Sequence, residues 1–308
     1  MLKYIIKRLV YGFLTFLIIM TLTFFLMHSI PGGPFDGDSL TKLPPEVQAN
    51  LMEKFGLDKP LGEQYLVYMN NLFHGELGIS ISYSPRSVKS IITSEIPVTA
   101  TLAFTSVSVT IVIGVLYGIV AALKQGKWQD QLAKVITTLG ITIPSFVMCT
   151  LLIYVFAVKL RVLPTMGFEG PKNLILPATA LSFGSIATLS RLTRSSLLDV
   201  VRQDYIRTAK AKGLKNSVVI FKHALKNSLL PVVTYLGPLV TALLTGSFVV
   251  EKIFAIPGIG REMVSAIGDR DYTMILGLTA IFSIIMITSY LVVDIMYALI
   301  DPRVKLDS

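Results

Sequence analysis

The sequence predicts an all-α integral membrane protein with six transmembrane helices. Of its 308 residues, 53% are hydrophobic and only 15% are charged, and the mean hydropathy is +0.67. Six apolar segments each come close to the length that crosses about 30 Å of hydrocarbon. Lys and Arg gather between these segments instead of spreading over the whole chain. Together these observations exclude a soluble domain with an ordinary surface.

The six predicted spans cover residues 9–30, 97–123, 135–158, 174–190, 232–250 and 274–299. The first resembles a secretory signal, because Lys3, Lys7 and Arg8 precede it, but its apolar core is too long and no small-residue cleavage site follows His28. It therefore stays as an anchor. The chain divides into an N-terminal anchor (1–30), an external segment (31–96) and a transmembrane core (97–308).

The distribution of charge predicts the orientation. With the amino terminus inside, Lys and Arg clearly outnumber acids in the cytoplasmic segments, whereas acids slightly outnumber Lys and Arg in the external ones. This asymmetry follows the positive-inside rule and places both termini in the cytoplasm. The formal net charge of +9 is thus a topology signal, and it does not indicate nucleic-acid binding.

The most basic stretch is the cytoplasmic segment 191–231, with nine Lys or Arg residues and two Asp. Its apolar residues recur at helical spacing on both sides of Gly213, from Ile206 and Ala209 to Val218 and Phe221. Glycine costs about 1 kcal/mol inside a helix but lets the backbone turn. The pattern predicts a helix, a glycine turn and a second helix on the cytoplasmic face.

The external segments are predicted to fold without spanning the membrane. Pro44 and Pro45 can open a helix that ends at Phe55, and Pro60 can open another that runs to Phe73. Between the last two spans, residues 257–260 (Pro-Gly-Ile-Gly) should be irregular, and the charges that follow make this segment too polar to cross hydrocarbon.

Several residues inside the predicted spans invite alternative interpretations. Gly114 and Gly118 allow close helix packing, which we expect within this chain and not in a dimer interface. Pro144 should kink the third span. Asp294, in the last span, has a packing role or marks a transport path, and we favour packing. The single Cys149 excludes an intrachain disulfide.

The chain lacks the motifs of an enzyme. It has no G-x-x-x-x-G-K-[ST] phosphate loop and no G-x-S-x-G nucleophile elbow. His28, His74 and His223 are scattered over both predicted sides of the membrane, so no metal site is expected. We expect a transport subunit that binds no cofactor itself.

Several motifs carry a resemblance to a known family. YIRTAKAKGL (205–214) and HALKNSLLP (223–231) resemble the cytoplasmic EAA loop of ABC-importer permeases, in the form found in peptide, nickel and glutathione permeases. Arg207 stands where that motif has its acidic residue. Further similar stretches are FGLDKPLGEQY (55–65), GELGIS (75–80), LPTMG (163–167), LPATALSFG (176–184), residues 246–277, and an ending with Asp294, Tyr297 and Asp301-Pro302-Arg303.

This resemblance implies the type I importer permease fold and a multi-pass place in a bacterial cell membrane. It implies an ATP-driven importer of oligopeptides or dipeptides, in which ATP and Mg²⁺ bind to partner subunits. The implied partners are a homologous second permease in a heterodimer, two cytoplasmic ATPase subunits, an external peptide-binding protein and membrane lipid. Whether residues 31–96 contact the binding protein or only pack on the spans stays open.

Two other functions stay open. One is an ABC permease for nickel or glutathione. The other is an ion-coupled secondary transporter, which needs intramembrane charges and usually an inverted repeat; only Asp294 fits the first requirement.

The resemblance also implies roles for particular residues. Those in the coupling loop 191–231 that would contact an ATPase are Asp204, Tyr205, Ile206, Arg207, Thr208, Ala209, Lys210, Ala211, Lys212 and Gly213. Those of an external gate are Glu251, Pro257, Gly258, Gly260, Arg270 and Asp271. Asp294 and Tyr297 are structural residues inside the last span.

Overall fold

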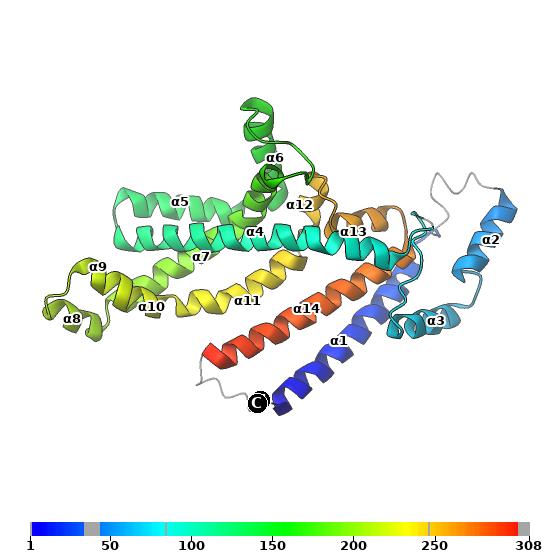
Figure 1. Ribbon diagram of the computed structural model, residues 1–308, viewed down its shortest axis with the longest axis horizontal. Helices are drawn as coiled ribbons and strands as arrows, with labels where there is room; N and C mark the ends of the chain where they lie inside the picture. The colour runs from blue at the N-terminus through cyan, green and yellow to red at the C-terminus, as the bar shows by residue number, and fades with distance from the viewer. Residues whose placement is uncertain (1, 34–43, 84, 246, 301–308) are drawn as a thin grey trace. The chain divides into compact units, whose positions relative to one another are not determined.

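The structure is a computed structural model that describes residues 2–33, 44–83, 85–245 and 247–300 (Figure 1). These residues are mostly helical, and among them a single isolated β-bridge joins Ile79 and Ser87. The helices are α1 (Leu2–Ser29), α2 (Pro45–Phe55), α3 (Leu61–Phe73), α4 (Val88–Leu123), α5 (Trp128–Thr142), α6 (Ser145–Leu152), the π-helix η1 (Ile153–Lys159), α7 (Pro171–Val201), α8 (Asp204–Ala211), α9 (Asn216–Val218), the π-helix η2 (Val219–Ala224), α10 (Leu225–Ser228), α11 (Leu230–Thr245), α12 (Phe248–Ile253), α13 (Ile259–Gly268) and α14 (Tyr272–Ile300).

The chain forms two compact units, and the described residues of the first lie within 2–98 and 257–288. Its core joins Met20 and Phe24 of α1 to Met69 of α3 and Leu276 of α14. The two external helices confirm the prediction from the prolines, because α2 begins directly after Pro44 and α3 directly after Pro60. Proline suits these positions because the first amides of a helix have no intrahelical acceptor.

The described residues of the second unit lie within 99–256 and 289–300. Within it α4 approaches α7 very closely: a Cβ added to Gly118 would lie 2.6 Å from the carbonyl oxygen of Ser190. Gly114 faces Leu189 in the same way. The pair of glycines therefore serves packing inside this chain, as predicted. Ser182 of α7 adds a hydrogen bond of 2.9 Å to the carbonyl of Ser106.

Six membrane spans are present in the described residues when each bent helix pair counts as one. Four single helices are long and apolar enough to cross a bilayer, namely α1, α4, α7 and α14. The remaining two are bent pairs, Trp128–Thr142 with Ser145–Lys159 at 110° and Asn216–Ser228 with Leu230–Leu244 at 46°. The first pair breaks at Pro144, which confirms the expected kink and makes it sharper than a bend within one helix.

Several predicted boundaries were wrong. The second span begins at Val88 instead of residue 97, and the third begins at Trp128 instead of residue 135. The fourth span continues to Val201 instead of stopping at residue 190, because residues 191–201 contain no helix breaker although they are polar. The fifth ends at Thr245, and residues 248–250 belong to α12. The segment 257–260 is irregular only in its first half, since α13 begins at Ile259 and includes Gly260.

Candidate functional site

The cytoplasmic segment folds as the predicted elbow, defined here as α8, the turn 212–215 and the return arm α9–η2–α10 (Figure 1). Gly213 has a φ of +79°, a backbone conformation that other residues rarely adopt. Its amide donates to the carbonyl of Lys210 at 2.9 Å and closes the end of α8. The glycine is thus the residue that lets the chain reverse.

One face of α8 is buried in the chain's own core. Ile206 is fully buried and Ala209 is nearly so, in a cluster with Ile119 of α4, Leu197 of α7 and Val219 of η2. These two members of the predicted docking set therefore face inward. They hold the elbow on the end of the spans and do not present side chains to a partner.

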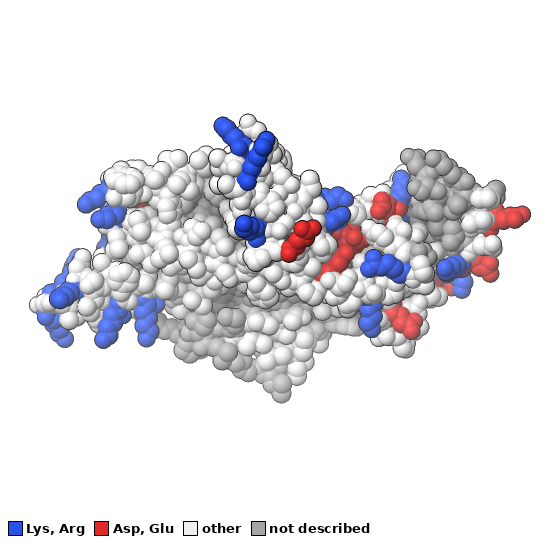
Figure 2. Space-filling model, turned by 45° about the horizontal axis from the view of Figure 1, so that its top comes forward, with Lys and Arg blue, Asp and Glu red and all other residues white. Residues whose placement is uncertain are grey.

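The other predicted docking residues lie on the exposed face of the elbow, and Figure 2 shows Lys and Arg side chains gathered at this end of the second unit. Large apolar side chains are exposed among these cations. Phe221 is 61% exposed, and Tyr205, Leu214 and Val218 are also exposed. We call these four residues the apolar elbow surface. A surface of aromatic and aliphatic groups ringed by cations is typical of a protein-binding site.

Two polar contacts shape the elbow from outside. Asn227 donates to the hydroxyl of Tyr205 at 2.8 Å, which ties the return arm to α8. Arg207, at the motif's acidic position, lies 3.5 Å from Asp204, and both side chains are largely exposed. Such an exposed pair contributes little to stability.

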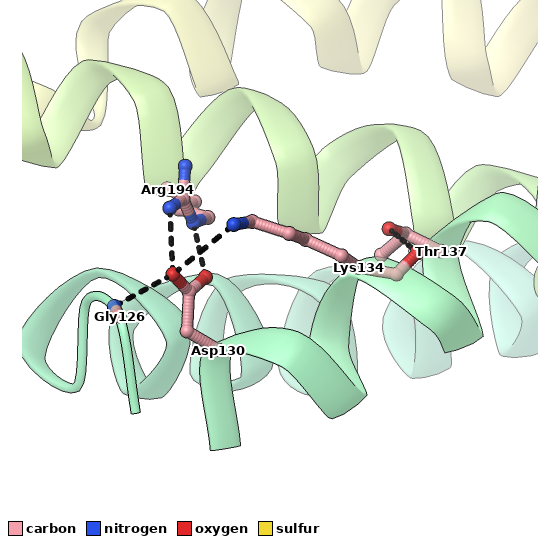
Figure 3. Close-up of polar contacts among 5 residues, drawn as sticks. All are labelled: Gly126, Asp130, Lys134, Thr137 and Arg194. Carbon is pink, nitrogen blue, oxygen red and sulfur yellow. Dashed lines mark hydrogen bonds and ion pairs between the residues drawn. The ribbon is translucent and has the colours of Figure 1, made fainter. Parts of the chain in front are cut away.

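The base of the elbow holds an ion pair that the sequence did not reveal (Figure 3). Arg194 of α7 makes a two-bond contact with Asp130 of α5, with Nε–Oδ1 at 2.7 Å and Nη2–Oδ2 at 2.9 Å. The amide of Gly126 donates to the same carboxylate at 3.0 Å, and Lys134 lies 3.5 Å from it. The Asp130 side chain is only 1% exposed, so this geometry compensates for the loss of its hydration.

The predicted external gate residues fall into both units. Glu251, in α12 of the second unit, is fully buried and accepts a hydrogen bond of 2.5 Å from Ser247. The first unit contains the others. Pro257 and Gly258 lie in the loop before α13, and Gly260 is buried in the first turn of α13.

Asp271 is the best-anchored residue of this set. Its carboxylate accepts from the Ser80 hydroxyl at 2.5 Å, the Ser82 amide at 3.0 Å and the Met274 amide at 3.0 Å. Asp271 therefore caps α14 and connects the loop between α3 and α4, which contains Ser80 and Ser82, to the start of α14. Arg270 beside it has a φ of +54° and donates to the carbonyl of Gly33 at 3.5 Å.

Glu262 of α13 is buried near Asp271. Its pKa is raised mainly because burial disfavours the charged carboxylate, and the negative charge of Asp271 raises it further. A raised folded-state pKa means that stability falls as pH rises through it, because the charged form is disfavoured in the folded protein. We expect Glu262→Gln to have a higher melting temperature than the wild type at pH 8. The difference should shrink as the pH is lowered toward the ordinary Glu pKa.

Melting curves of the purified chain between pH 5 and 8 test this expectation. Glu63→Gln is the control, since Glu63 is exposed and lies on α3. A Glu262→Gln curve parallel to that of the wild type would contradict the assignment.

Asp294 lies part-buried in α14. Tyr297 belongs to the same helix, but its side chain lies outside the described part of the chain, as do Asp301, Pro302 and Arg303. Their packing role stays a prediction. Among the described residues no group of His, Cys, Asp or Glu has the arrangement of a metal site.

Comparisons with known proteins agree on one kind of protein. The family described as "Binding-protein-dependent transport system inner membrane component" matches residues 114–306, and its N-terminal companion, "Binding-prot-dependent transport system membrane comp, N-term", matches residues 1–103. A dipeptide transport system permease protein of Bacillus subtilis is 45% identical over 306 residues, which are 99% of each chain. An oligopeptide transport system permease protein of Salmonella typhimurium is 41% identical over 307 residues, covering 99% of this chain and 100% of the other.

A solved structure is similar in fold. The inward-facing MetNI methionine ABC transporter contains a chain that matches 69% of this one and 97% of its own length, with a TM-score of 0.58 and 17% identity.

Proposed function

Because this chain belongs to the family of binding-protein-dependent transport system inner membrane components, we propose that it is the permease subunit of an ATP-driven importer of dipeptides or oligopeptides. It is a multi-pass protein of the cell membrane and a transport subunit. An ion-coupled secondary transporter is not supported, since this family depends on a binding protein.

The proposed assembly contains this chain, a homologous second permease, two cytoplasmic ATPase subunits and an external peptide-binding protein. ATP and Mg²⁺ bind to the ATPases, and this chain binds neither. The elbow receives the motion of an ATPase subunit. The contact of α8 with α4 and α7 through Ile206 and Ala209 then passes it to the spans.

The observation that carries this proposal is the two-sided construction of α8. One face of α8 packs against the ends of α4 and α7, and its exposed face carries Tyr205, which with Leu214, Val218 and Phe221 of the turn and return arm forms the apolar elbow surface among cations. A helix that only lay on anionic lipid would need no such connection to two spans. The construction suits a lever between a soluble partner and the membrane helices.

Co-purification from mild detergent tests the proposal directly. We expect a second permease and ATPase subunits to accompany the tagged chain, with ATP hydrolysis stimulated by a peptide-loaded binding protein. Stimulation by nickel- or glutathione-loaded protein instead would change the cargo. Recovery of the chain alone, with uptake driven by an ion gradient, would refute the importer.

Phe221→Ser should weaken ATPase binding. An exposed aromatic anchor in an interface contributes about 2 kcal/mol or more, so the affinity should fall about 30-fold. Titration of the reconstituted permease with ATPase subunit measures it. Phe73→Ser on the external helix α3 removes an equally exposed ring and serves as the control; equal effects of the two substitutions would remove Phe221 from the interface.

A further inference from the structure

A cavity of about 320 Å³ opens between α4, α5 and α7, next to the Asp130–Arg194 ion pair. We call it the α5–α7 pocket. Alanines form its apolar part, and hydroxyls and cations form the rest; its lining residues are Ala121, Ala133, Lys134, Thr137, Thr138, Ser190, Arg191 and Arg194. The elbow surface and its docking role do not involve this pocket.

The pocket lies at the level of the cytoplasmic membrane interface. Ala121 is two residues from the end of α4, and α5 begins shortly afterwards at Trp128. Trp128 is the only tryptophan of the chain and is 70% exposed. Exposed tryptophan beside an apolar span is typical of the headgroup region of a bilayer. The predicted topology places this end of α4 and α5 in the cytoplasm.

The cations of the pocket exceed its acids. Three basic side chains line it, and Asp130, which lies behind Arg194, is the acid beside them. Figure 3 shows Lys134 extended along α5 toward this carboxylate, at 3.5 Å. In the described part of the chain, Arg191 has no acidic group within ion-pair distance. The pocket therefore keeps a net positive charge.

The ion pair also fixes the geometry of the pocket. Asp130 engages Nε and Nη2 of Arg194, so the guanidinium plane is held while further N–H groups remain to donate. Thr138 and Ser190, which both carry a hydroxyl, are among the lining residues. Guanidinium, ammonium and hydroxyl donors are the groups that bind phosphate oxygens.

We propose that the α5–α7 pocket binds the phosphate group of an anionic phospholipid of the cytoplasmic leaflet. Its position at the interface, its net positive charge and its alanine-lined apolar part suit a headgroup that enters from the bilayer with its acyl chains beside α4 and α5. Basic pockets between membrane helices on the cytoplasmic side bind anionic headgroups in this way.

The test uses the full chain, purified in detergent and depleted of lipid. Binding of phosphatidylglycerol, phosphatidylcholine and inorganic phosphate is measured by native mass spectrometry and by the rise in melting temperature. The pocket variant is Lys134→Gln/Arg191→Gln, which keeps Arg194 so that Asp130 stays paired. The control is Lys222→Gln/Lys226→Gln, which removes two exposed cations on the same side of the membrane outside the pocket.

We expect phosphatidylglycerol to bind the wild type and the control equally and the pocket variant about 30-fold more weakly, from about 1 kcal/mol for each lost cation. Arg191→Gln alone should weaken binding about fivefold, which keeps the test valid if the double variant is unstable.

Three results would overturn the proposal. Unchanged binding of phosphatidylglycerol to the pocket variant and to Arg191→Gln would place the lipid elsewhere. Equal protection by inorganic phosphate would assign the pocket to a soluble phosphate. Loss of the second permease when the tagged pocket variant is co-purified from mild detergent, with lipid binding intact, would show that an acidic group of a partner protein fills the pocket.

Discussion

Arg194→Leu is expected to lower the free energy of unfolding by about 3–5 kcal/mol, which is the usual cost of removing one partner from a buried ion pair. The Asp130 side chain is 1% exposed and receives two hydrogen bonds from Arg194. After the substitution only the amide of Gly126 and the more distant Lys134 face its charge. Unfolding of the purified chain in detergent, followed by heat or denaturant, measures the loss.

Two further variants test whether the unpaired, buried carboxylate of Asp130 causes the loss of stability. Arg194→Lys keeps the positive charge but not the two-bond geometry, so it should recover only part of the stability. Asp130→Leu/Arg194→Leu removes both charges and should be more stable than Arg194→Leu. If the double variant is as unstable as the single one, lost packing is the cause and not the buried carboxylate.

Ala209→Phe is expected to uncouple ATP hydrolysis from uptake in the reconstituted importer. Ala209 is nearly buried in the core between α8 and the ends of α4 and α7, so a phenyl ring in its place would push against neighbouring side chains. Overpacking of this kind costs about 1–3 kcal/mol and would displace α8 from the ends of α4 and α7, so uptake should fall about tenfold or more. The ATPase should continue to hydrolyse ATP, because its exposed contacts remain. Parallel assays of hydrolysis and peptide uptake in proteoliposomes measure the effect.

Ala211→Phe gives the matched contrast on the same helix. Ala211 is exposed, so its substitution should alter the affinity for the ATPase and leave the packing of α8 on α4 and α7 intact. Normal uptake by Ala209→Phe would refute the lever, and identical phenotypes of the two variants would show that burial does not distinguish them.

The sequence predicted the features that depend on neighbouring residues. Gly213 between two apolar periodic runs predicted the elbow, and its φ of +79° confirms the reason. Pro44 and Pro60 predicted where α2 and α3 begin, since proline is restrictive enough to act locally. Pro144 predicted the kink of the third span for the same reason.

Features that depend on distant residues were missed. Arg194 and Asp130 are 64 residues apart, and the charges that follow residue 190 wrongly predicted the end of the fourth span there. A helix that carries an arginine to a buried partner can continue through polar sequence. Periodicity likewise placed Ile206 and Ala209 on one face of α8 but did not indicate that this face is covered by the chain's own core.

The break at Pro144 makes the third span depend on a neighbouring helix. α5 has 15 residues and, at 1.5 Å per residue, is about 22 Å long, too short to cross the hydrocarbon by itself. Proline has no amide hydrogen, so Pro144 cannot donate to the carbonyl of Gly140 four residues before it. This carbonyl oxygen lies close to α7: a Cβ added to Gly184 would be 3.3 Å from it. Exposed to lipid, such a carbonyl would be costly. This part of the chain therefore depends on α7 to keep the Gly140 carbonyl away from lipid.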